Sequence, residues 1–366
     1  MTERITIIGG GILGSMIAWR LAERGASVTV LDGGAAYEQA SEGSLCWLNV
    51  ASCADEAYAT FRISSLRLWH EIAGGAPDCP VRFPGSLVWT GDASASDGQI
   101  ALMERLGWPV QGLERADLQR LFPGARDLPD HALLAPEEGV AHPGQIVGWA
   151  RARAAAAGAT FIEANVAELV IAGGGVAGAS LSDGRTYQSD AVIIAAGRGT
   201  ARLLESVDIP LPQRPGAGLT GWTAPCAPVV RHAVSSDRLD FWQDDAGRVL
   251  FTSPAAKTPE NADGMGVEEM VEALASLYPE MAGTNVEHSF ARTRPLPEDG
   301  FPALGQTRYA GLFAACTHSG MTLAPVIADC LVKDILGAPG KGTPDRYAVN
   351  RFAFAPSDPP IAGSLA

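Results

Sequence analysis

Near its N-terminus the sequence reads ITIIGGGILGSMIAWRLAERGASVTVLD over residues 5–32. The β-branched run Ile5–Ile8 predicts a buried parallel strand, and the turn after it fits the pattern G-x-G-x-x-G. Apolar residues at i, i+4 spacing then predict a helix to about Arg24, closed by Gly25, and a second strand that ends at Asp32. The stretch therefore predicts the strand–turn–helix–strand unit of a doubly wound sheet.

Each part of this unit has a mechanical role in binding a dinucleotide. Gly9 permits the tight turn, Gly11 lets the backbone approach a pyrophosphate, and Gly14 lets the helix pack closely on the strand. The helix N-terminus offers N–H groups and a positive dipole to the phosphates. Asp32 is placed to accept hydrogen bonds from ribose hydroxyls, and its charge disfavours the 2′-phosphate of NADP. The motif by itself fits both NAD and FAD.

The composition predicts a folded protein of two domains. Of 366 residues, 47% are hydrophobic and 19% are charged, which is enough apolar material for large cores. A net charge of −14 disfavours nucleic acid and anionic membrane surfaces as partners. No stretch approaches the roughly 20 apolar residues that a membrane span needs.

The six cysteines predict neither a metal site nor a disulfide framework. None has C-x-x-C spacing or a neighbouring pair of histidines, which disfavours structural zinc. Scattered thiols in a chain of this length are typical of a reducing compartment, and no signal-peptide pattern precedes the strand at Ile5. We therefore expect a cytoplasmic protein.

Beyond residue 32, the chain alternates between two kinds of secondary-structure pattern. Patterns of the α/β type predict helices at 56–72, 143–157 and 321–336 and strands at 160–162, 190–197 and 311–316. Short strands and turns predict strands at 83–89, 240–243 and 248–252, helices at 116–121 and 267–278, and a hairpin over 170–184 that turns at Asp183-Gly184.

These segments predict an α/β fold, α+β overall. A discontinuous, Rossmann-like dinucleotide-binding domain is expected from residues 1–75, 140–212 and 288–340. A second, antiparallel-sheet domain for the substrate is expected from residues 76–139 and 213–287, and a tail from 341–366. A third, late segment in the cofactor domain favours FAD over NAD.

Four places along the chain then carry a family resemblance. They are Gly9–Gly14 with Asp32, Ala40–Asn49, Ala195–Gly197, and a C-terminal pair of segments. In that pair, RPLPEDGFPALG over 294–305 is similar to R-P-x-x-x-D-G-x-P-x-x-G, and HSGMTLAP over 318–325 is similar to the start of a closing flavin-binding helix. The chain thus resembles the D-amino acid oxidase superfamily of FAD-dependent oxidoreductases, in its glycine oxidase and sarcosine oxidase branch. An NAD-dependent dehydrogenase would leave the C-terminal pair unexplained.

The resemblance implies bound FAD with the substrate stacked against its isoalloxazine ring. The cofactor-binding residues that it implies are Gly9, Gly11, Ile12, Leu13, Gly14, Asp32, Ser41, Ser44, Leu45, Cys46, Val166, Ala196, Gly197, His318, Ser319, Gly320, Met321 and Thr322. A helix that begins near Gly320 can aim its N–H groups and dipole at the flavin pyrimidine edge, where negative charge develops on reduction. Some relatives attach FAD covalently; Cys46 and Cys316 are the candidates for such a link, and buried unreactive thiols are the alternative.

The resemblance also implies the reaction: oxidation of a C–N bond in an amino acid or a primary or secondary amine. Hydride transfer to flavin would give an imine that hydrolyses, and dioxygen or another acceptor would reoxidise the flavin. Arg294 is expected to bind a substrate carboxylate through its guanidinium fork, with a scaffold ion pair to Asp299 or Glu298 as the alternative. Arg292 is a second candidate for that role.

Two further residues are candidates for the reaction site. His318 is either a catalytic base or a hydrogen-bond partner of flavin or backbone. Trp242, on the predicted strand 240–243, is a candidate for lining the substrate pocket.

Other functions remain open. One is oxidation of a 2-hydroxy acid on the same fold, which Arg294 would serve equally well. Another is a flavin-binding subunit of a larger amine or opine dehydrogenase; because the chain has no iron–sulfur cysteine cluster, an electron relay would need a partner subunit. The substrate, its chirality, the electron acceptor and a homo-oligomeric state are also open.

Overall fold

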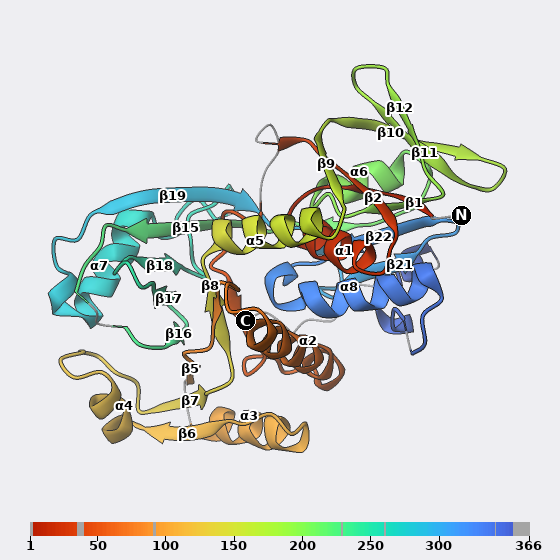
Figure 1. Cartoon of the computed structure of the whole chain (residues 1–366). Coiled ribbons are helices and arrows are strands. Elements are labelled where there is room, and N and C mark those ends of the chain that lie inside the picture. The colour runs from red at the N-terminus through yellow and green to blue at the C-terminus, as the bar shows by residue number, and fades with distance from the viewer. Residues whose placement is uncertain are drawn as a thin grey trace. The chain divides into compact units, whose positions relative to one another are not determined.

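The computed structural model describes residues 3–34, 40–90, 93–227, 230–259, 261–340 and 342–353. The chain divides into two compact units, and Figure 1 labels many of their helices and strands. Unit 1 comprises the described parts of 1–42, 144–216 and 293–363, and unit 2 comprises those of 43–143 and 217–292. None of the described helices combines the length and apolarity that crossing a membrane requires.

Unit 1 is built on a parallel sheet. Its strands are β1 (Arg4–Ile8), β2 (Ser27–Asp32), β9 (Thr160–Glu163), β10 (Val166–Ala172), β11 (Gly175–Leu181), β12 (Thr186–Gln188), β13 (Ala191–Ile194), β14 (Gln213–Arg214), β20 (Leu296–Pro297), β21 (Ala303–Gln306) and β22 (Leu312–Cys316). Its helices are α1 (Ile12–Ala22), α5 (Pro143–Ala156), α6 (Gly199–Glu205) and α8 (Gly320–Leu336), with 3-10 turns η3 (Asp345–Tyr347) and η4 (Val349–Ala353). In the described chain, the main sheet has the order β21-β22-β13-β1-β2-β9, and only β21 runs antiparallel to its neighbour.

The strand order reverses at β1. This strand pairs with β2 on one side and with β13 on the other, so successive crossovers leave it in opposite directions. In open parallel sheets, ligands bind outside the carboxyl ends of the strands at such a switch point. The fold of unit 1 therefore places its ligand edge where β1 and β13 end.

Apolar runs explain the burial of this sheet. Ile7 and Val30 are 0% exposed, as expected for strands that are covered on both faces. Helix α1 packs against α8, and Ile17 and Ile327 are also fully buried. Each such aliphatic side chain contributes about 1.5–3 kcal/mol on removal from water, which makes the α1–α8 pair a main source of stability in unit 1.

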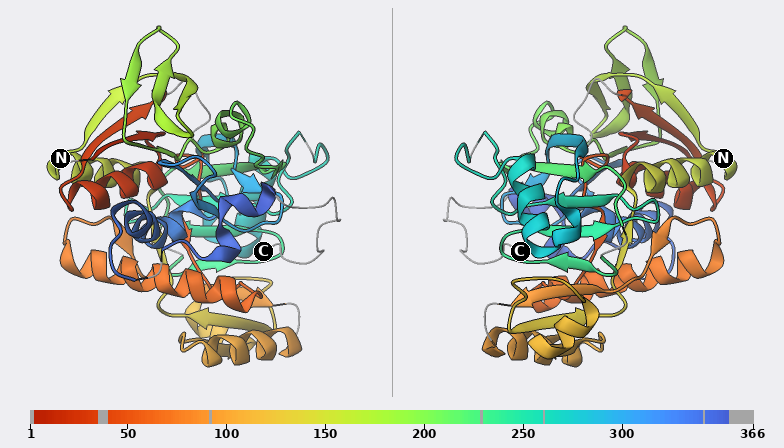
Figure 2. Two further views of the ribbon diagram at one scale, coloured as in Figure 1. Left: turned by 90° about the vertical axis from the view of Figure 1, so that its right-hand side faces the viewer. Right: turned by 90° about the vertical axis from the view of Figure 1, so that its left-hand side faces the viewer.

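A smaller sheet of β10, β11 and β12 differs from the predicted hairpin. The first hairpin, β10–β11, turns at Gly173-Gly174, both with positive φ, whereas Asp183-Gly184 lies in the next turn, between β11 and β12. The Asp183 carboxylate accepts the Arg185 N–H at 3.1 Å in that turn. The turn residues were correctly recognised, but they close a different pair of strands. Figure 2 shows this yellow-green sheet beside the red N-terminal strands.

Unit 2 is built on a mostly antiparallel sheet. Its strands are β3 (Trp47–Leu48), β4 (Val81–Arg82), β5 (Ser86–Thr90), β6 (Gln111–Glu114), β7 (His131–Ala135), β8 (Gly139–Ala141), β15 (Ala217–Thr223), β16 (Ala233–Ser235), β17 (Asp240–Gln243), β18 (Val249–Thr252) and β19 (Val286–Thr293). Its helices are α2 (Glu56–Gly75), α3 (Ala93–Arg105), α4 (Arg115–Leu121) and α7 (Val267–Leu277), with the 3-10 turn η2 (Pro279–Met281).

The large sheet of unit 2 has the order β19-β15-β18-β17-β16-β5-β7-β6 among the residues described. Strands β16 and β5 run parallel, and the other pairs from β15 to β6 run antiparallel. Figure 1 shows α3 and α4 beside β6, and both helices contact β6 and β7. The parallel sheet of unit 1 and the antiparallel sheet of unit 2 confirm the predicted fold class.

The compact units divide the chain differently from the predicted domains. Residues 43–75, expected in the cofactor domain, lie in unit 2, because β3 pairs with β8 and Arg62 Nε of α2 donates to Asn49 O at 2.8 Å. Residues 140–143 and 288–292 also lie in unit 2. Conversely, residues 213–216 lie in unit 1, where β14 pairs with β20.

A buried carboxylate holds three segments of unit 2 together. Glu138 is 0% exposed, and its Oε1 accepts the N–H groups of Val50 at 2.6 Å and Ala51 at 2.5 Å. Ser86 donates its hydroxyl to Oε2. Burial raises the pKa of Glu138, an effect that these hydrogen bonds oppose. Glu138 thus joins the chain after β3 to the start of β5.

We expect Glu138→Ala to lower the free energy of unfolding by about 2–5 kcal/mol, because two buried N–H groups and one hydroxyl lose their acceptor. Glu138→Gln keeps a neutral acceptor for both N–H groups and should cost less than about 1 kcal/mol. Since the folded pKa lies above the unfolded one, the wild type should lose stability as pH rises from the unfolded to the folded pKa, and Glu138→Gln should not.

Denaturant unfolding at several pH values measures both effects. The matched control is Glu137→Gln at the exposed neighbouring position. If Glu138→Ala and Glu138→Gln lowered the free energy of unfolding equally, the assigned hydrogen bonds would be contradicted.

Candidate active site

Four neighbouring strands bring the predicted cofactor motifs of unit 1 to one edge. Gly9 follows β1, Asp32 ends β2, Ala195–Gly197 follow β13, and His318 comes two residues after β22. These strands are parallel, so their carboxyl ends meet. A Cβ placed on Gly9 would lie 2.5 Å from Ala195 O, which shows how closely two of these segments approach. The predicted motifs therefore converge at the switch point of the sheet.

The glycine-rich turn has the close contacts that its sequence predicts. Gly9 has φ +106°, and a Cβ on Gly14 would lie 1.9 Å from Gly9 O. A Cβ on Gly11 would meet Ser41 Oγ at 3.1 Å, and the Ile12 N–H at the start of α1 donates to that hydroxyl at 3.2 Å. The N-terminus of α1 thus binds an oxygen atom, as it would bind a phosphate oxygen.

Asp32 is held by a residue that no sequence pattern indicates. Arg151 of α5 places Nη1 3.0 Å from Asp32 Oδ2, and its Cζ lies 4.9 Å from the centroid of the Phe161 ring. Gly10 also lies against this carboxylate, because a Cβ there would lie 2.6 Å from Asp32 Oδ2. Gly10 stands in the glycine run and was identifiable; Arg151, 119 residues from Asp32, had no signal.

The C-terminal motif meets the N-terminal one at the helix starts. A Cβ on Gly320, the first residue of α8, would lie 3.6 Å from Ile12 Cγ2 and 3.8 Å from Leu13 Cγ, so the first turns of α8 and α1 are in contact. Thr317, just before His318, is 2% exposed, and its hydroxyl has no hydrogen-bond partner in the described chain. A buried polar atom of this kind at a convergence of helix N-termini fits a bound polar ligand.

The other predicted cofactor residues of unit 1 have mixed surroundings. Met321 and Thr322 are buried in the first turn of α8, and Val166, 7% exposed, belongs to the apolar core that includes Leu169. Gly197 has φ +57°, and a Cβ on it would meet no atom within 4 Å. The backbone is therefore open on one side at Gly197 and closely packed at Gly9.

Arg294 and His318 contact each other in unit 1. Arg294 Nη1 lies 3.0 Å from His318 Nε2, and both side chains are exposed. The backbone N–H of Arg294 donates to Gly216 O at 2.9 Å, and its Nε donates to the same oxygen at 3.4 Å. Asp299, a predicted alternative partner of Arg294, instead pairs with Arg351 at 2.7 Å. Gly216 O therefore fixes the backbone of Arg294, and the guanidinium of Arg294 faces His318.

The predicted cofactor residues Ser44, Leu45 and Cys46 lie in unit 2. The Cys46 N–H donates to Ser44 Oγ at 2.9 Å, and the Trp242 indole N–H donates to Leu45 O at 2.7 Å. Cys46 has φ +57°, a left-handed conformation that is uncommon outside glycine. These contacts join the predicted cofactor segment to the predicted substrate residue Trp242.

Burial decides the chemistry of the two candidate linking thiols. Cys46 is 1% exposed and Cys316 is 0% exposed. Burial raises the pKa of Cys46 and raises that of Cys316 to about 12. Because the thiolate is the nucleophile, both residues have the character of inert core thiols.

Arg292 lies in unit 2 at the end of β19. Its Cζ is 5.3 Å from the centroid of the Phe290 ring, and its Nη1 donates to Ala291 O at 2.9 Å. A Cβ on Gly43 would lie 2.3 Å from Arg292 Cγ, so this side chain packs directly on Gly43. The structure thus gives Arg292 a packing role against the segment that carries Ser44–Cys46.

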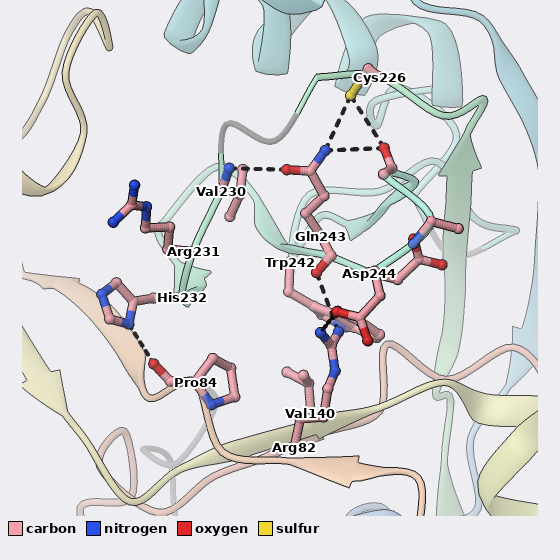
Figure 3. Close-up of a pocket in the computed structure, with 13 residues that line it drawn as sticks. Arg82, Pro84, Val140, Cys226, Val230, Arg231, His232, Trp242, Gln243 and Asp244 are labelled. Carbon is pink, nitrogen blue, oxygen red and sulfur yellow. Dashed lines mark hydrogen bonds and ion pairs between the residues drawn. The ribbon is translucent and has the colours of Figure 1, made fainter.

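Trp242 forms part of the wall of a pocket within unit 2. The pocket has a volume of about 450 Å³, and Figure 3 shows Arg82 and Asp244 on one side of it and Arg231 and His232 on the other. Arg82 Cζ lies 5.7 Å from the centroid of the Trp242 ring. Trp242 is only 2% exposed, so little of its ring is accessible from the pocket, and charged residues such as Arg82 and Asp244 also line it.

We expect Gly11→Val to weaken FAD binding at least about tenfold, because the new side chain fills the space at the N-terminus of α1 next to Ser41 Oγ. Flavin absorbance of the purified protein, and titration of the flavin-free form with FAD, measure the effect. The matched control is Gly148→Val in α5, where a Cβ meets no atom within 4 Å. A fully flavin-loaded Gly11→Val protein would contradict the assigned phosphate site.

Comparisons with known proteins agree with this geometry. The chain is 26% identical over 357 residues to glycine oxidase of Geobacillus kaustophilus, covering 92% of this chain and 94% of that protein. It is also 26% identical over 389 residues to the bifunctional protein ThiO/ThiG of Trichormus variabilis; that match covers 99% of this chain but spans 57% of the relative's length.

A solved structure and a family model extend these matches. The crystal structure of glycine oxidase from Geobacillus kaustophilus superposes with a TM-score of 0.84 at 22% identity, covering 96% of this chain and 99% of that one. Residues 4–333 match the family model described as FAD dependent oxidoreductase. The predicted cofactor, FAD, and the predicted enzyme class are thereby confirmed. The chain belongs to the DAO family of FAD-dependent oxidoreductases.

Proposed function

We propose that this chain oxidises the C–N bond of an amino acid or of another amine that carries a carboxylate. Bound FAD would supply the hydride acceptor; the resulting imine would hydrolyse in water, and dioxygen or another acceptor would take up the electrons. Similarity to glycine oxidase supports an amine rather than an alcohol as the reacting group. The chain's own residues supply the recognition of the carboxylate.

The observation that carries this proposal is the position of Arg294. Its guanidinium is exposed, is anchored to Gly216 O, and contacts His318, which lies two residues before the start of α8. An exposed guanidinium fork suits bidentate binding of a carboxylate. A carboxylate held by Arg294 would be fixed near the converging helix starts of unit 1.

The close approach at Gly216 explains why the anchor is precise. A Cβ on Gly216 would lie 2.7 Å from Arg294 O, so a side chain there would push the two segments apart. The short pairing of β14 with β20 continues the same contact. Glycine at 216 thus lets the backbone of Arg294 lie close enough for its hydrogen bond, which limits the freedom of the guanidinium.

The direct test is an anaerobic visible spectrum of the purified protein before and after addition of a substrate pool. Separate pools contain D-amino acids, N-methyl amino acids, simple amines or 2-hydroxy acids. We expect the flavin band to bleach with a pool of carboxylated amines. Bleaching by 2-hydroxy acids alone would replace the proposal with C–O oxidation. A flavin band that no pool bleaches would favour a subunit that needs its partner for turnover.

We expect Arg294→Ala to raise KM for a carboxylated substrate by about 10- to 100-fold, the loss of one charge-assisted interaction, while FAD stays bound. Steady-state kinetics with the substrate found above, and with an amine that lacks a carboxylate, measure the effect. The control is Arg185→Ala in the exposed β11–β12 turn. Normal binding of acidic substrates by Arg294→Ala would show that the carboxylate binds elsewhere.

A further inference from the structure

We propose that Arg294 and His318 form a substrate-operated switch: the substrate carboxylate takes Arg294, and this releases His318 Nε2 to accept a proton from the substrate's ammonium group. The proposal rests on the proposed function and adds a residue role to it. Its basis is the 3.0 Å contact between Arg294 Nη1 and His318 Nε2.

That contact determines the tautomer of His318. A guanidinium only donates hydrogen bonds, so His318 Nε2 has to be the acceptor and carries no proton. The ring proton then resides on Nδ1, which lies 3.3 Å from Ser319 Oγ, an oxygen that can accept it. The hydrogen-bond network therefore assigns a neutral imidazole to the substrate-free protein.

The charge of Arg294 reinforces this assignment. A second positive charge on the ring, 3.0 Å from a guanidinium nitrogen, would be repelled. While Arg294 faces the ring, His318 Nε2 is occupied and the imidazolium is disfavoured. In this state His318 Nε2 is not available to accept a proton from the substrate.

A carboxylate reverses both effects. It forms a charge-assisted, bidentate interaction with a guanidinium, which is stronger than the bond from a guanidinium to a neutral imidazole. Arg294 and His318 are both exposed, so a small anion reaches them directly. The backbone anchor to Gly216 O keeps Arg294 in place during the exchange, so only the guanidinium changes its partner.

The proton transfer that follows is balanced. The substrate arrives as an ammonium ion, which has no lone pair to support loss of hydride from the adjacent carbon. One N–H bond of the ammonium breaks and the Nε2–H bond of His318 forms, leaving a neutral amine and an imidazolium. The Nδ1–H keeps donating its hydrogen bond to Ser319 Oγ, and the positive charge moves from the substrate to the ring without an oxidant. Redox chemistry begins only after this step.

The switch has a consequence for the substrate class. An amine without a carboxylate leaves Arg294 on His318, so the base stays blocked and the ammonium keeps its proton. The pair therefore selects substrates that carry both an ammonium and a carboxylate group. In this arrangement, recognition of one group makes the chemistry at the other possible.

The first test needs no turnover. Nitrogen NMR of the oxidised, FAD-loaded enzyme, with labelled histidines, reports the protonation of each ring nitrogen. Acetate is the probe anion, and the His318→Gln variant assigns the His318 signal. We expect an unprotonated Nε2 without acetate. Acetate should bring proton uptake, which calorimetry in buffers of different ionisation enthalpy also measures. Arg294→Ala should abolish the uptake.

The second test is the pH profile of turnover. His318→Gln should lower kcat/KM by about 10- to 100-fold near neutral pH, within the usual contribution of a general base. This decrease in kcat/KM should vanish at high pH, where the substrate amine is already neutral. His131→Gln in unit 2 is the matched control, with the same substitution at a histidine outside the pair.

Three results would overturn the switch: a protonated Nε2 in the acetate-free enzyme, acetate binding without proton uptake, or a pH profile of His318→Gln parallel to that of the wild type. Failure of the proposed function has a different signature. In that case no carboxylated amine bleaches the flavin. The NMR and calorimetric measurements with acetate still test the switch, because they do not depend on turnover.

Discussion

The structure of unit 1 depends on the contact between two glycines five residues apart. A Cβ on Gly14 would lie 1.9 Å from Gly9 O, so helix α1 can approach the turn after β1 only because that carbon is missing. Backbone atoms cannot move aside as a flexible side chain can. The position of α1 sets that of α8, which contacts Ile12 and Leu13 through Gly320. The placement of His318 beside these helix starts follows from the same close packing.

The motifs that could be predicted from the sequence are those whose physics is local. The turn between β1 and α1, the acid at the end of β2 and the Asp244–Gly247 turn all depend on residues a few positions apart. Glycine is recognisable where a positive φ or a close approach excludes a Cβ, and strands and helices have their own periods. The order of these motifs along the chain then sufficed to identify the parallel sheet and the family.

The features that could not be predicted depend on long-range pairing. The unit boundary after residue 42 follows from the two-residue strand β3, whose partner β8 lies about 90 residues away and whose sequence has no strand period of its own. Helix α3 begins Ala-Ser-Ala-Ser-Asp-Gly, a stretch without an apolar repeat. Arg151 and Glu138 are one arginine and one glutamate among many, and only the fold decides which groups they meet. The contact of Arg294 with His318 is of the same kind.

The order of strands in unit 1 also determines when this protein can finish folding on the ribosome. Strand β22, near the C-terminal end of the described chain, lies between β21 and β13, and α8 follows it to cover α1. The N-terminal turn is therefore synthesised first but is enclosed last, after residue 336 has emerged. The segments of unit 2 end at residue 292, so its sheet can form earlier. While the second segment of unit 2 is made, α1 remains without α8 and β13 without β22, and an unfinished parallel sheet is exposed to aggregation in this interval.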